Sequence, residues 1–533
     1  VINVTTGPGG INALNGVFGA FTDSIPMLVL SGQVKRETSL FHRPLPGLRQ
    51  LGDQEAPIAA MAAPVCKSAL AIAEAAQLET ELPRALALAT QGRPGPAWLD
   101  IPLDIQAAQH ELAFHILPQT ADDETNTLPD DCRRIVEQLR KAHRPLLVAG
   151  TGVRLSGAER MLLEFAEQHG IPVATAWTHD LIASDHPLFA GRPGTIGTRA
   201  GNFAAQNADL VIVIGSRLNI RQTSYNWDAF AARAFKVHVD IDPAELNKPT
   251  LRTDLRVQAD AGRFLHALRR QVTGQPLPDF SPWASWLRGL RTRFPVVPEA
   301  WQATHPINPY ALVARVFRQL RHDDIIVCGN ASACILPFQA GELQAAQRMF
   351  SNSGSASMGY DLPAAIGAAL AAPQRRVVCF AGDGSLQMNV QELQTLRTLG
   401  LNVLVVVLDN QGYLSIRQTH ENFFGTVVGA TPQSGVEFPD YARLADAYGI
   451  PGTAICSADD LPALDAALAQ DGPALLHVHV DPQQEFEPRL KSRRDENGAF
   501  QTPELDDMFP FLDAPVLAAI REEAAAIRHG AGQ

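Results

Sequence analysis

Two polar segments, each following an apolar strand candidate, carry the side chains best suited to bind a metal ion. Asp383 lies in a Gly-Asp-Gly-Ser segment after the expected strand 376–380, and Asn410 follows the expected strand 403–408. Open α/β sheets bind ligands at the carboxyl ends of their strands, where both segments should lie. A carboxylate and an amide oxygen are hard ligands that suit Mg²⁺, which also takes phosphate oxygens and water. The two segments therefore predict a site for Mg²⁺ and a phosphate group.

The residues around Asp383 add features that fit an anion. Gly382 and Gly384 would let the backbone approach a phosphate closely. A helix N-terminus beyond Ser385 would present free N–H groups and the positive end of the helix dipole. Each segment alone is more often a plain turn. The order strand, Gly-Asp-Gly, helix, strand, Asn, with 27 residues from Asp383 to Asn410, favours a binding site instead.

This arrangement resembles the thiamine-diphosphate (ThDP) binding motif, which runs from Gly-Asp-Gly to a closing Asn over that span. By this resemblance, Asp383, Asn410 and the backbone carbonyl of Gly412 would hold the Mg²⁺ that binds the diphosphate of the cofactor. The family commonly has Asn-Asn where this chain has Asp409 before Asn410. Because the second position carries the ligand, metal binding is still expected.

The resemblance covers essentially the whole chain and is to acetolactate synthase-like ThDP enzymes. The segment from Thr5 to Asn12 looks like the Thr-Ser-Gly-Pro-Gly-Ala-Thr-Asn loop of their pyrimidine-binding domain, so Pro8, Gly9 and Asn12 are candidate cofactor contacts. Met358, 25 residues before Asp383, matches the large apolar residue that props the cofactor in a bent shape. A methionine at a helix-start turn is more often core filler.

Two further residues match positions near the family's substrate channel. Gln54 and Lys67 resemble the Gln-Glu and Lys pattern found there and are candidate catalytic residues, although a lone Gln or Lys is usually a surface residue. The family's activating glutamate normally precedes the Gly-Pro-Gly loop by some two dozen residues, whereas this chain begins four residues before Thr5. We therefore expect an N-terminally incomplete sequence, which opens on what looks like a central strand at Val1–Val4.

The resemblance implies decarboxylation of a 2-keto acid, with pyruvate as the donor, by an enzyme in which ThDP supplies the difficult chemistry. The two-carbon unit left behind is then protonated, oxidised or added to a second carbonyl. Three alternatives stay open: a carboligase that makes acetolactate or a similar product, a 2-keto acid decarboxylase or oxidase, and a catalytically inactive partner protein with this fold.

The acceptor site departs from the family pattern. Thr419 stands where acetolactate synthases carry a Trp that favours 2-ketobutyrate, and Asp53 stands where the family has the Phe of Phe-Gln-Glu. These residues predict a more polar pocket that accepts a hydroxylated or sugar-derived carbonyl. Arg417 and His420 would face such a substrate or lie in solvent.

Short apolar strands alternate with Ala- and Leu-rich amphipathic helices, which predicts parallel sheets covered on both faces. We expect an α/β fold of three doubly wound parallel-sheet domains with a C-terminal extension. Polar residues 117–130 read as one linker, and the Pro- and Trp-rich residues 273–308 as a second connection. The expected parts are the pyrimidine-binding domain 1–116, the central nucleotide-binding-like domain 130–272, the diphosphate-binding domain 305–484 and the tail 485–533.

The central domain carries strand-end glycines at several turns. They fall at 148–152, at Gly197 and at 215–217, and an acidic turn follows at 239–243. In acetolactate synthases this domain holds FAD, and in many relatives it is empty. Because isolated Gly-x-Gly patterns are weak evidence, both alternatives stay open.

Composition bounds the remaining function classes. The net charge of −12 and the absence of a Lys/Arg cluster argue against nucleic-acid binding, and no apolar run is long enough to span a membrane. Six cysteines without a Cys-x-x-Cys pattern suggest buried free thiols in a reducing cytoplasm. In the resembling family the pyrimidine loop of one subunit meets the diphosphate loop of another, so we expect a homodimer or homotetramer.

Overall fold

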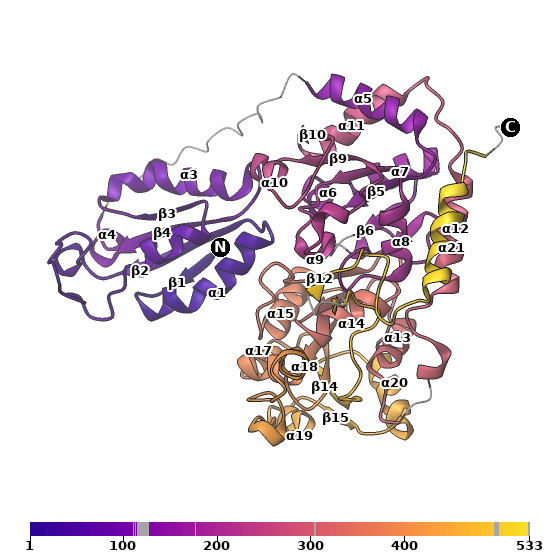
Figure 1. Cartoon of the computed structure of the whole chain (residues 1–533). Helices are drawn as coiled ribbons and strands as arrows, with labels where there is room; N and C mark the ends of the chain where they lie inside the picture. The colour runs from indigo at the N-terminus through magenta and orange to yellow at the C-terminus, as the bar shows by residue number, and fades with distance from the viewer. Residues whose placement is uncertain are drawn as a thin grey trace. The chain divides into compact units, whose positions relative to one another are not determined.

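The computed structural model describes residues 1–109, 111, 113, 127–175, 177, 179–302, 305–494 and 500–530. By its backbone contacts the chain divides into two compact units (Figure 1). The first spans Val1–Glu124 and includes Asn352–Ser357, and the second spans Thr125–Ser351 and Met358–Gln533. Among the described residues, no helix combines the length and the apolar character needed to cross a membrane.

The first unit is built on one parallel sheet with the order β1-β2-β4-β3. Its strands are β1 (Ile2–Val4), β2 (Met27–Gln33), β3 (Ser68–Ala71) and β4 (Pro96–Pro102), and its helices are α1 (Pro8–Thr22), α2 (Ile58–Ala62), α3 (Leu78–Thr90) and α4 (Leu103–Gln106). Alternate strand residues face opposite layers. Val29 and Trp98 pack with Val17 of α1, while Leu28 and Leu99 pack against the α3 side. The prediction of a central strand at Val1–Val4 was wrong for the described residues, because β1 pairs only with β2 and forms the edge.

A buried carboxyl group lies in the middle of β4. Asp100 is 3% exposed and accepts hydrogen bonds from Ser31 Oγ at 2.5 Å and from Gln33 Nε2 at 2.9 Å. Burial raises the pKa of Asp100 to about 6, against the lowering effect of these two hydrogen bonds. No cation pairs with Asp100 in the described part of the chain.

The burial of Asp100 predicts a pH-dependent stability. Because the pKa in the folded state is raised above that of an unfolded aspartate, the folded protein loses stability as pH rises from about 4 through about 6. Asp100→Asn cannot ionise and should escape this loss. Between about pH 5 and about pH 8, the unfolding free energy of wild type should fall by about 1 kcal/mol relative to that of Asp100→Asn. Denaturant unfolding at both pH values measures the shift, and an unchanged difference would contradict it.

The second unit contains two six-stranded parallel sheets. The first has the order β10-β9-β8-β5-β6-β7. Its strands are β5 (Pro145–Ala149), β6 (Val173–Thr175), β7 (Phe189–Gly191), β8 (Leu210–Ile214), β9 (Phe235–Asp240) and β10 (Leu255–Gln258). Its helices are α5 (Leu128–Lys141), α6 (Thr151–Leu155), α7 (Glu159–His169), α8 (Arg199–Asn207), α9 (Ile220–Thr223), α10 (Pro243–Asn247) and α11 (Ala261–Val272).

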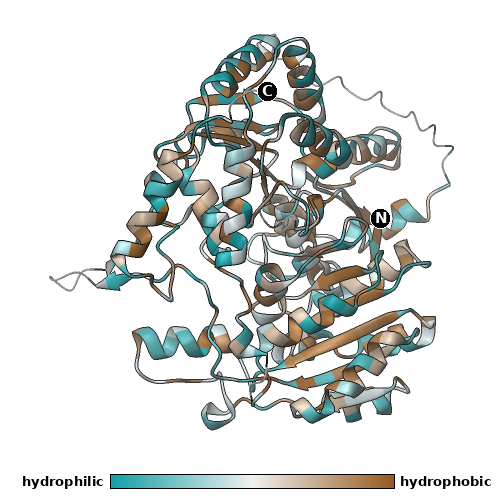
Figure 2. Ribbon diagram, turned by 90° about the vertical axis from the view of Figure 1, so that its right-hand side faces the viewer, coloured by the Kyte–Doolittle hydropathy of each residue, from teal (hydrophilic) through white to brown (hydrophobic). Residues whose placement is uncertain are grey.

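Both faces of this sheet are buried, which explains its continuous apolar strands. Leu147 and Ile212 face α5, α7 and α11, while their neighbours Val148 and Val213 face α8. Figure 2 shows strands that are largely brown beside helices of mixed colours, as amphipathic covering helices require.

Two segments expected to lie outside the three domains contribute to this core. The Pro- and Trp-rich stretch forms α12 (Ser281–Arg293), whose Trp283 is fully buried beside α8. The tail forms the two-stranded pair β17 (Arg493–Arg494) and β18 (Phe500–Gln501) and then α21 (Ala514–Ala526), which lies beside α12 (Figure 1). The tail is therefore packed against the central sheet. The predicted linker 117–130 lies mostly outside the described residues, and its last three residues already belong to α5.

The second sheet has the order β12-β11-β13-β14-β16-β15. Its strands are β11 (Ile325–Cys328), β12 (Arg348–Ser351), β13 (Val377–Gly382), β14 (Val403–Asp409), β15 (Gly452–Ile455) and β16 (Ala474–His479). Its helices are α13 (Pro309–Gln319), α14 (Ser332–Ala340), α15 (Asp361–Ala371), α16 (Asp383–Leu386), α17 (Glu392–Leu399), α18 (Leu414–Phe423), α19 (Tyr441–Ala447) and α20 (Leu461–Ala469). One face packs against α13, α14 and α20, and the other against α15, α17 and α19.

The predicted fold class of three parallel-sheet α/β domains is confirmed. The exact domain boundaries stay a prediction. All six cysteines are free, but the expectation that all are buried was wrong, because Cys456 is exposed and Cys66 is half-buried.

Candidate cofactor and metal site

The two predicted ligand segments meet at one edge of the second sheet. Strands β13 and β14 are parallel neighbours, with Gly382 paired to Leu408, so Asp383 and Asn410 leave the sheet at the same end. The Gly412 N–H donates to Asp383 Oδ2 at 2.9 Å and joins the two segments directly. Asp383 is 3% exposed and Asn410 is 6% exposed, so both ligand candidates are withdrawn from water.

Asn410 carries an acceptor that the described residues leave unused. Its Nδ2 donates to Ser332 Oγ at 3.0 Å, at the first residue of α14, which fixes the orientation of the amide. Its Oδ1 is buried and has no hydrogen-bond partner among the described residues. Since buried polar atoms are rarely unpaired, this oxygen fits a bound cation.

The carboxylate of Asp383 is held by backbone N–H groups. Oδ1 accepts from the N–H of Gly384 at 2.7 Å, and Oδ2 accepts from that of Gly412. Burial raises the pKa of Asp383, and the neighbouring Asp409 carboxylate raises it as well. A divalent cation at this point would favour the ionised carboxylate, so the donor set fits Mg²⁺.

Two glycines allow these segments to pack. A β-carbon on Gly384 would lie 2.2 Å from the ring of Tyr413, and one on Gly412 would lie 2.0 Å from the carbonyl oxygen of Ala430. Gly412 also has φ +131°, a conformation that L-residues rarely adopt. A β-carbon on Gly382 would instead lie in open space, with the β-carbon of Ser385 at 3.9 Å as its nearest neighbour.

The helix after Asp383 differs from the expected one. The helix predicted beyond Ser385 is present as α17, but the short helix α16 precedes it and begins at Asp383 itself. Ser385 Oγ donates to Asp361 Oδ2 at 2.7 Å and accepts from the N–H of Gly359 at 2.9 Å. This hydroxyl therefore ties the turn at Met358 to the Asp383 segment, and Met358 is half-buried there.

A histidine pair next to the site was missed from the sequence. Asp409 Oδ2 lies 2.9 Å from His477 Nε2 and 3.1 Å from His479 Nδ1, both on the neighbouring strand β16. Burial opposes ionisation of Asp409, but these contacts hold its pKa well below the usual range. The alternating His-Val-His of β16 was the available signal, because alternate residues of a strand share one face. Asp409 thus takes its partners from β16, next to the metal-binding segment.

In the first unit, the Gly-Pro-Gly loop forms the start of α1. Pro8 is its first residue, after Gly7 with φ +56°. A β-carbon on Gly7 would lie 1.9 Å from the carbonyl oxygen of Gln54, so the loop and the Gln54 turn are in contact. Gly9 is half-buried and Asn12 is exposed.

The candidate catalytic pair is not joined by any hydrogen bond in the described residues. Gln54 is exposed and has φ +58°, so it forms a strained turn. Lys67 Nζ donates to the carbonyl oxygens of Gln91 at 2.7 Å and Arg93 at 2.8 Å. The contacts of Lys67 hold the loop after α3.

The candidate acceptor residues on α18 have partners within the protein. Thr419 is exposed, and its hydroxyl donates to the carbonyl of Ser415 at 2.9 Å. Arg417 is 9% exposed and donates to the carbonyl of Pro482, so the solvent alternative is wrong for it. His420 Nδ1 accepts from the N–H of Val428 at 3.2 Å. Asp53 is exposed in the first unit.

The strand-end glycines of the central sheet pack against one another. A β-carbon on Gly150 would lie 2.4 Å from the carbonyl oxygen of Gly215, and one on Gly152 would lie 2.7 Å from the α-carbon of Gly215. The close packing of these turns therefore explains why glycine occupies the positions, without a bound nucleotide. At the same edge, buried polar atoms of Thr175, Asn219 and Gln222 have no partner among the described residues.

Three family models match the chain in order. They are the thiamine pyrophosphate enzyme N-terminal TPP binding domain over residues 1–56, the central domain over 132–268 and the C-terminal TPP binding domain over 333–478. The last match contains both Asp383 and Asn410.

Acetolactate synthases are similar over most of the chain. The large subunit of acetolactate synthase isozyme 2 from Escherichia coli strain K12 is 34% identical over 90% of this chain and 83% of its own length. The large subunit from Lactococcus lactis subsp. lactis is 30% identical over 92% of this chain and 83% of its own length. A probable acetolactate synthase 2 from Oryza sativa subsp. japonica is 32% identical over 93% of this chain and 75% of its own length. The chain belongs to the acetolactate synthase-like group of the thiamine pyrophosphate enzyme family.

Proposed function

We propose that the protein decarboxylates a 2-keto acid, with pyruvate as donor, and adds the remaining two-carbon unit to a second carbonyl compound. The observation that carries the proposal is the buried pair Asp383 and Asn410, with an unused Asn410 oxygen, at the carboxyl end of two neighbouring strands. The similarity to acetolactate synthases over about nine tenths of the chain supports the carboligation.

Asp383 and Asn410, with the carbonyl of Gly412, would hold Mg²⁺, and the metal would hold the diphosphate of ThDP. Bound ThDP supplies the carbon that attacks the 2-keto group and stabilises the charge left when CO₂ departs. The backbone N–H groups of Gly384 and Gly412 keep the Asp383 carboxylate in place for the metal. Ser385 holds the Met358 turn beside this segment.

The acceptor preference follows from Thr419. An apolar pocket wall distinguishes two acceptors that differ by one methylene by about 1–3 kcal/mol. Thr419 is exposed and its hydroxyl is bonded within its own helix, so it supplies no such wall. Wild type should therefore show little preference for 2-ketobutyrate over pyruvate as acceptor and should tolerate polar aldehydes or ketones.

A competition assay with both keto acids, wild type beside Thr419→Trp, measures this preference. The tryptophan variant should favour 2-ketobutyrate more than wild type does. Strong preference for 2-ketobutyrate in wild type would contradict the pocket argument and favour an ordinary branched-chain pathway synthase. Acetaldehyde or acetate as the main product would favour the decarboxylase or oxidase alternative.

We propose assembly as a homodimer or homotetramer, since closed symmetric oligomers are the commonest assemblies and each cofactor would lie between two subunits. Sedimentation of the ThDP- and Mg²⁺-loaded protein should give one such species. An active monomer would contradict the proposal.

FAD as a second cofactor of the central domain is supported by the unpartnered polar atoms of Thr175, Asn219 and Gln222 at its strand ends. The glycine geometry gives no support, because the turns at Gly150 and Gly215 contact each other directly. An empty central domain, as in many members of the resembling group, is the alternative, and flavin absorbance of the purified protein distinguishes the two.

A further inference from the structure

A pocket of about 540 Å³ lies in the second unit, away from the metal-binding segment. Its lining comes from the central part of the chain, around β7, α8 and α12, and from α13, α14 and the loop after α14. Asp383, Asn410 and the strand-end glycines Gly150 and Gly215 do not line it. Its volume falls in the range of small-molecule sites.

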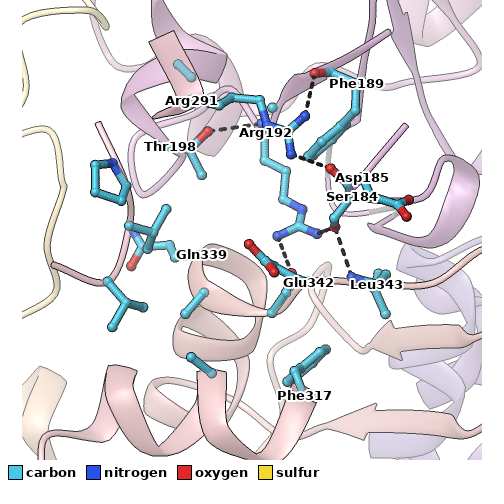
Figure 3. A pocket seen from close by; sticks show the side chains of 18 of the residues that line it. Ser184, Asp185, Phe189, Arg192, Thr198, Arg291, Phe317, Gln339, Glu342 and Leu343 are labelled. Atoms are coloured by element: carbon cyan, nitrogen blue, oxygen red, sulfur yellow. Dashed lines mark hydrogen bonds between the residues drawn. The ribbon is translucent and has the colours of Figure 1, made fainter. Parts of the chain in front are cut away.

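Two arginines in the lining lack acidic partners. Arg192 is 3% exposed and extends into the centre of the lining, and Arg291 comes from α12 (Figure 3). Within the part of the chain that the structure describes, no ion pair involves either one. Their guanidinium carbons lie 5.5 Å and 4.8 Å from the centre of the same Phe189 ring. Two positive charges are thus gathered around one aromatic side chain.

The contacts of these arginines are to neutral oxygens. Arg192 donates to the carbonyl oxygens of Phe338 at 2.7 Å and Gly341 at 2.9 Å and to Ser184 Oγ at 3.3 Å, and its Nε is buried without a partner. Arg291 donates to the carbonyl oxygens of Phe189 and Ser184. Carbonyl oxygens satisfy donors but do not neutralise a charge. Burial and the neighbouring charge of Arg291 lower the pKa of Arg192 to about 10, against the weaker raising effect of Glu342.

The acidic residues of the lining lie where water screens them. Glu342 is exposed and acts on both arginines from beyond ion-pair distance, and the exposed Asp185 acts on Arg291. The exposed Arg318 from α13 also lines the pocket. The buried part of the lining is positive and apolar, since it contains Arg192, Phe189 and Phe317. Buried charges are normally paired, so the missing counter-charge at Arg192 calls for an anion from outside the chain.

We propose that this pocket binds a small organic oxyanion, a carboxylate or a phosphate ester, whose charged group contacts Arg192 and Arg291 and whose apolar body packs against the phenylalanines of the lining. Guanidinium groups favour such oxyanions because their planar N–H donors match two oxygens at once. The binding is independent of the proposed reaction, since none of the lining residues belongs to the cofactor site.

Calorimetric titration of the ThDP- and Mg²⁺-loaded protein tests the site, because the loaded cofactor blocks the diphosphate position. The probes share one apolar body: phenylacetate, phenyl phosphate and the neutral 2-phenylethanol. At least one anion should bind about tenfold or more tightly than the alcohol. The tighter of the two anions then assigns the carboxylate or the phosphate class. Equal affinity for all three probes, or no binding of either anion, overturns the proposal.

Two variants and one control locate the binding. Arg291→Gln removes a charge, and Ala314→Phe fills the pocket from α13 while keeping both arginines; each should weaken the better anion about tenfold or more. Arg288→Gln, on the exposed face of the same helix α12, should leave the affinity unchanged. Thermal unfolding shows whether each variant is folded. Folded variants that bind the anion as wild type does would overturn the assignment to this pocket.

Discussion

Asp383→Ala should abolish retention of ThDP, with an affinity loss of about a hundredfold or more in the presence of Mg²⁺. Truncating one partner of a buried charge interaction costs about 2–5 kcal/mol, and Asp383 is the only carboxylate in the proposed ligand set. The variant also loses the acceptor for the Gly412 N–H, so the Asn410 segment loses its link to β13. Calorimetric titration with ThDP and Mg²⁺ measures the effect.

Two further variants separate charge from fold. Asp383→Asn keeps the shape and an acceptor oxygen but removes the negative charge, and it should lose most of the affinity as well. Asp323→Ala removes a half-buried carboxylate from the same part of the chain and should bind ThDP like wild type. Unchanged affinity of a folded Asp383→Ala protein would contradict the metal assignment.

Gly412→Ala should displace the metal-binding segment. Its β-carbon would lie 2.0 Å from the carbonyl oxygen of Ala430, a backbone atom that cannot move aside like a side chain, and φ +131° is strained for alanine. We expect a stability loss of more than about 2 kcal/mol and a ThDP affinity at least about tenfold weaker. Denaturant unfolding and calorimetry measure the two effects.

Gly472→Ala is the matched control for the strain alone. Gly472 has φ +100°, but a β-carbon there would meet open space. It should lose stability through its backbone conformation and keep the wild-type affinity for ThDP. If Gly412→Ala bound ThDP as tightly as Gly472→Ala does, the close packing of the segment would not matter for the cofactor.

The edge that holds the site could be predicted because its signals are local. Apolar strands ending in Asp383 and in Asn410 imply a common edge once the sheet is parallel, and β13 and β14 are indeed neighbours. The contacts that complete the site are far apart in sequence. Ser332 lies 78 residues from its partner Asn410, and His477 lies 68 from Asp409, so only the folded chain reveals them.

Composition misled where side chains have more than one role. Proline and tryptophan around residue 283 suggested a connection, but Trp283 is a core residue and its Nε1 donates to the carbonyl of Pro145. The sequence could not decide whether Arg417 faces substrate or solvent, because its partner is the carbonyl of Pro482, which follows a different strand. The Arg192 pocket had no sequence signal at all, since its lining is gathered from separate elements.

The most direct test of the account follows isotope-labelled pyruvate with the protein loaded with ThDP and Mg²⁺. We predict that two pyruvate molecules give one CO₂ and one acetolactate, with label from both, and that the product disappears in Asp383→Asn. Label that stays in pyruvate, or product that forms equally well in Asp383→Asn, would contradict the proposed carboligase and the role of Asp383 in it.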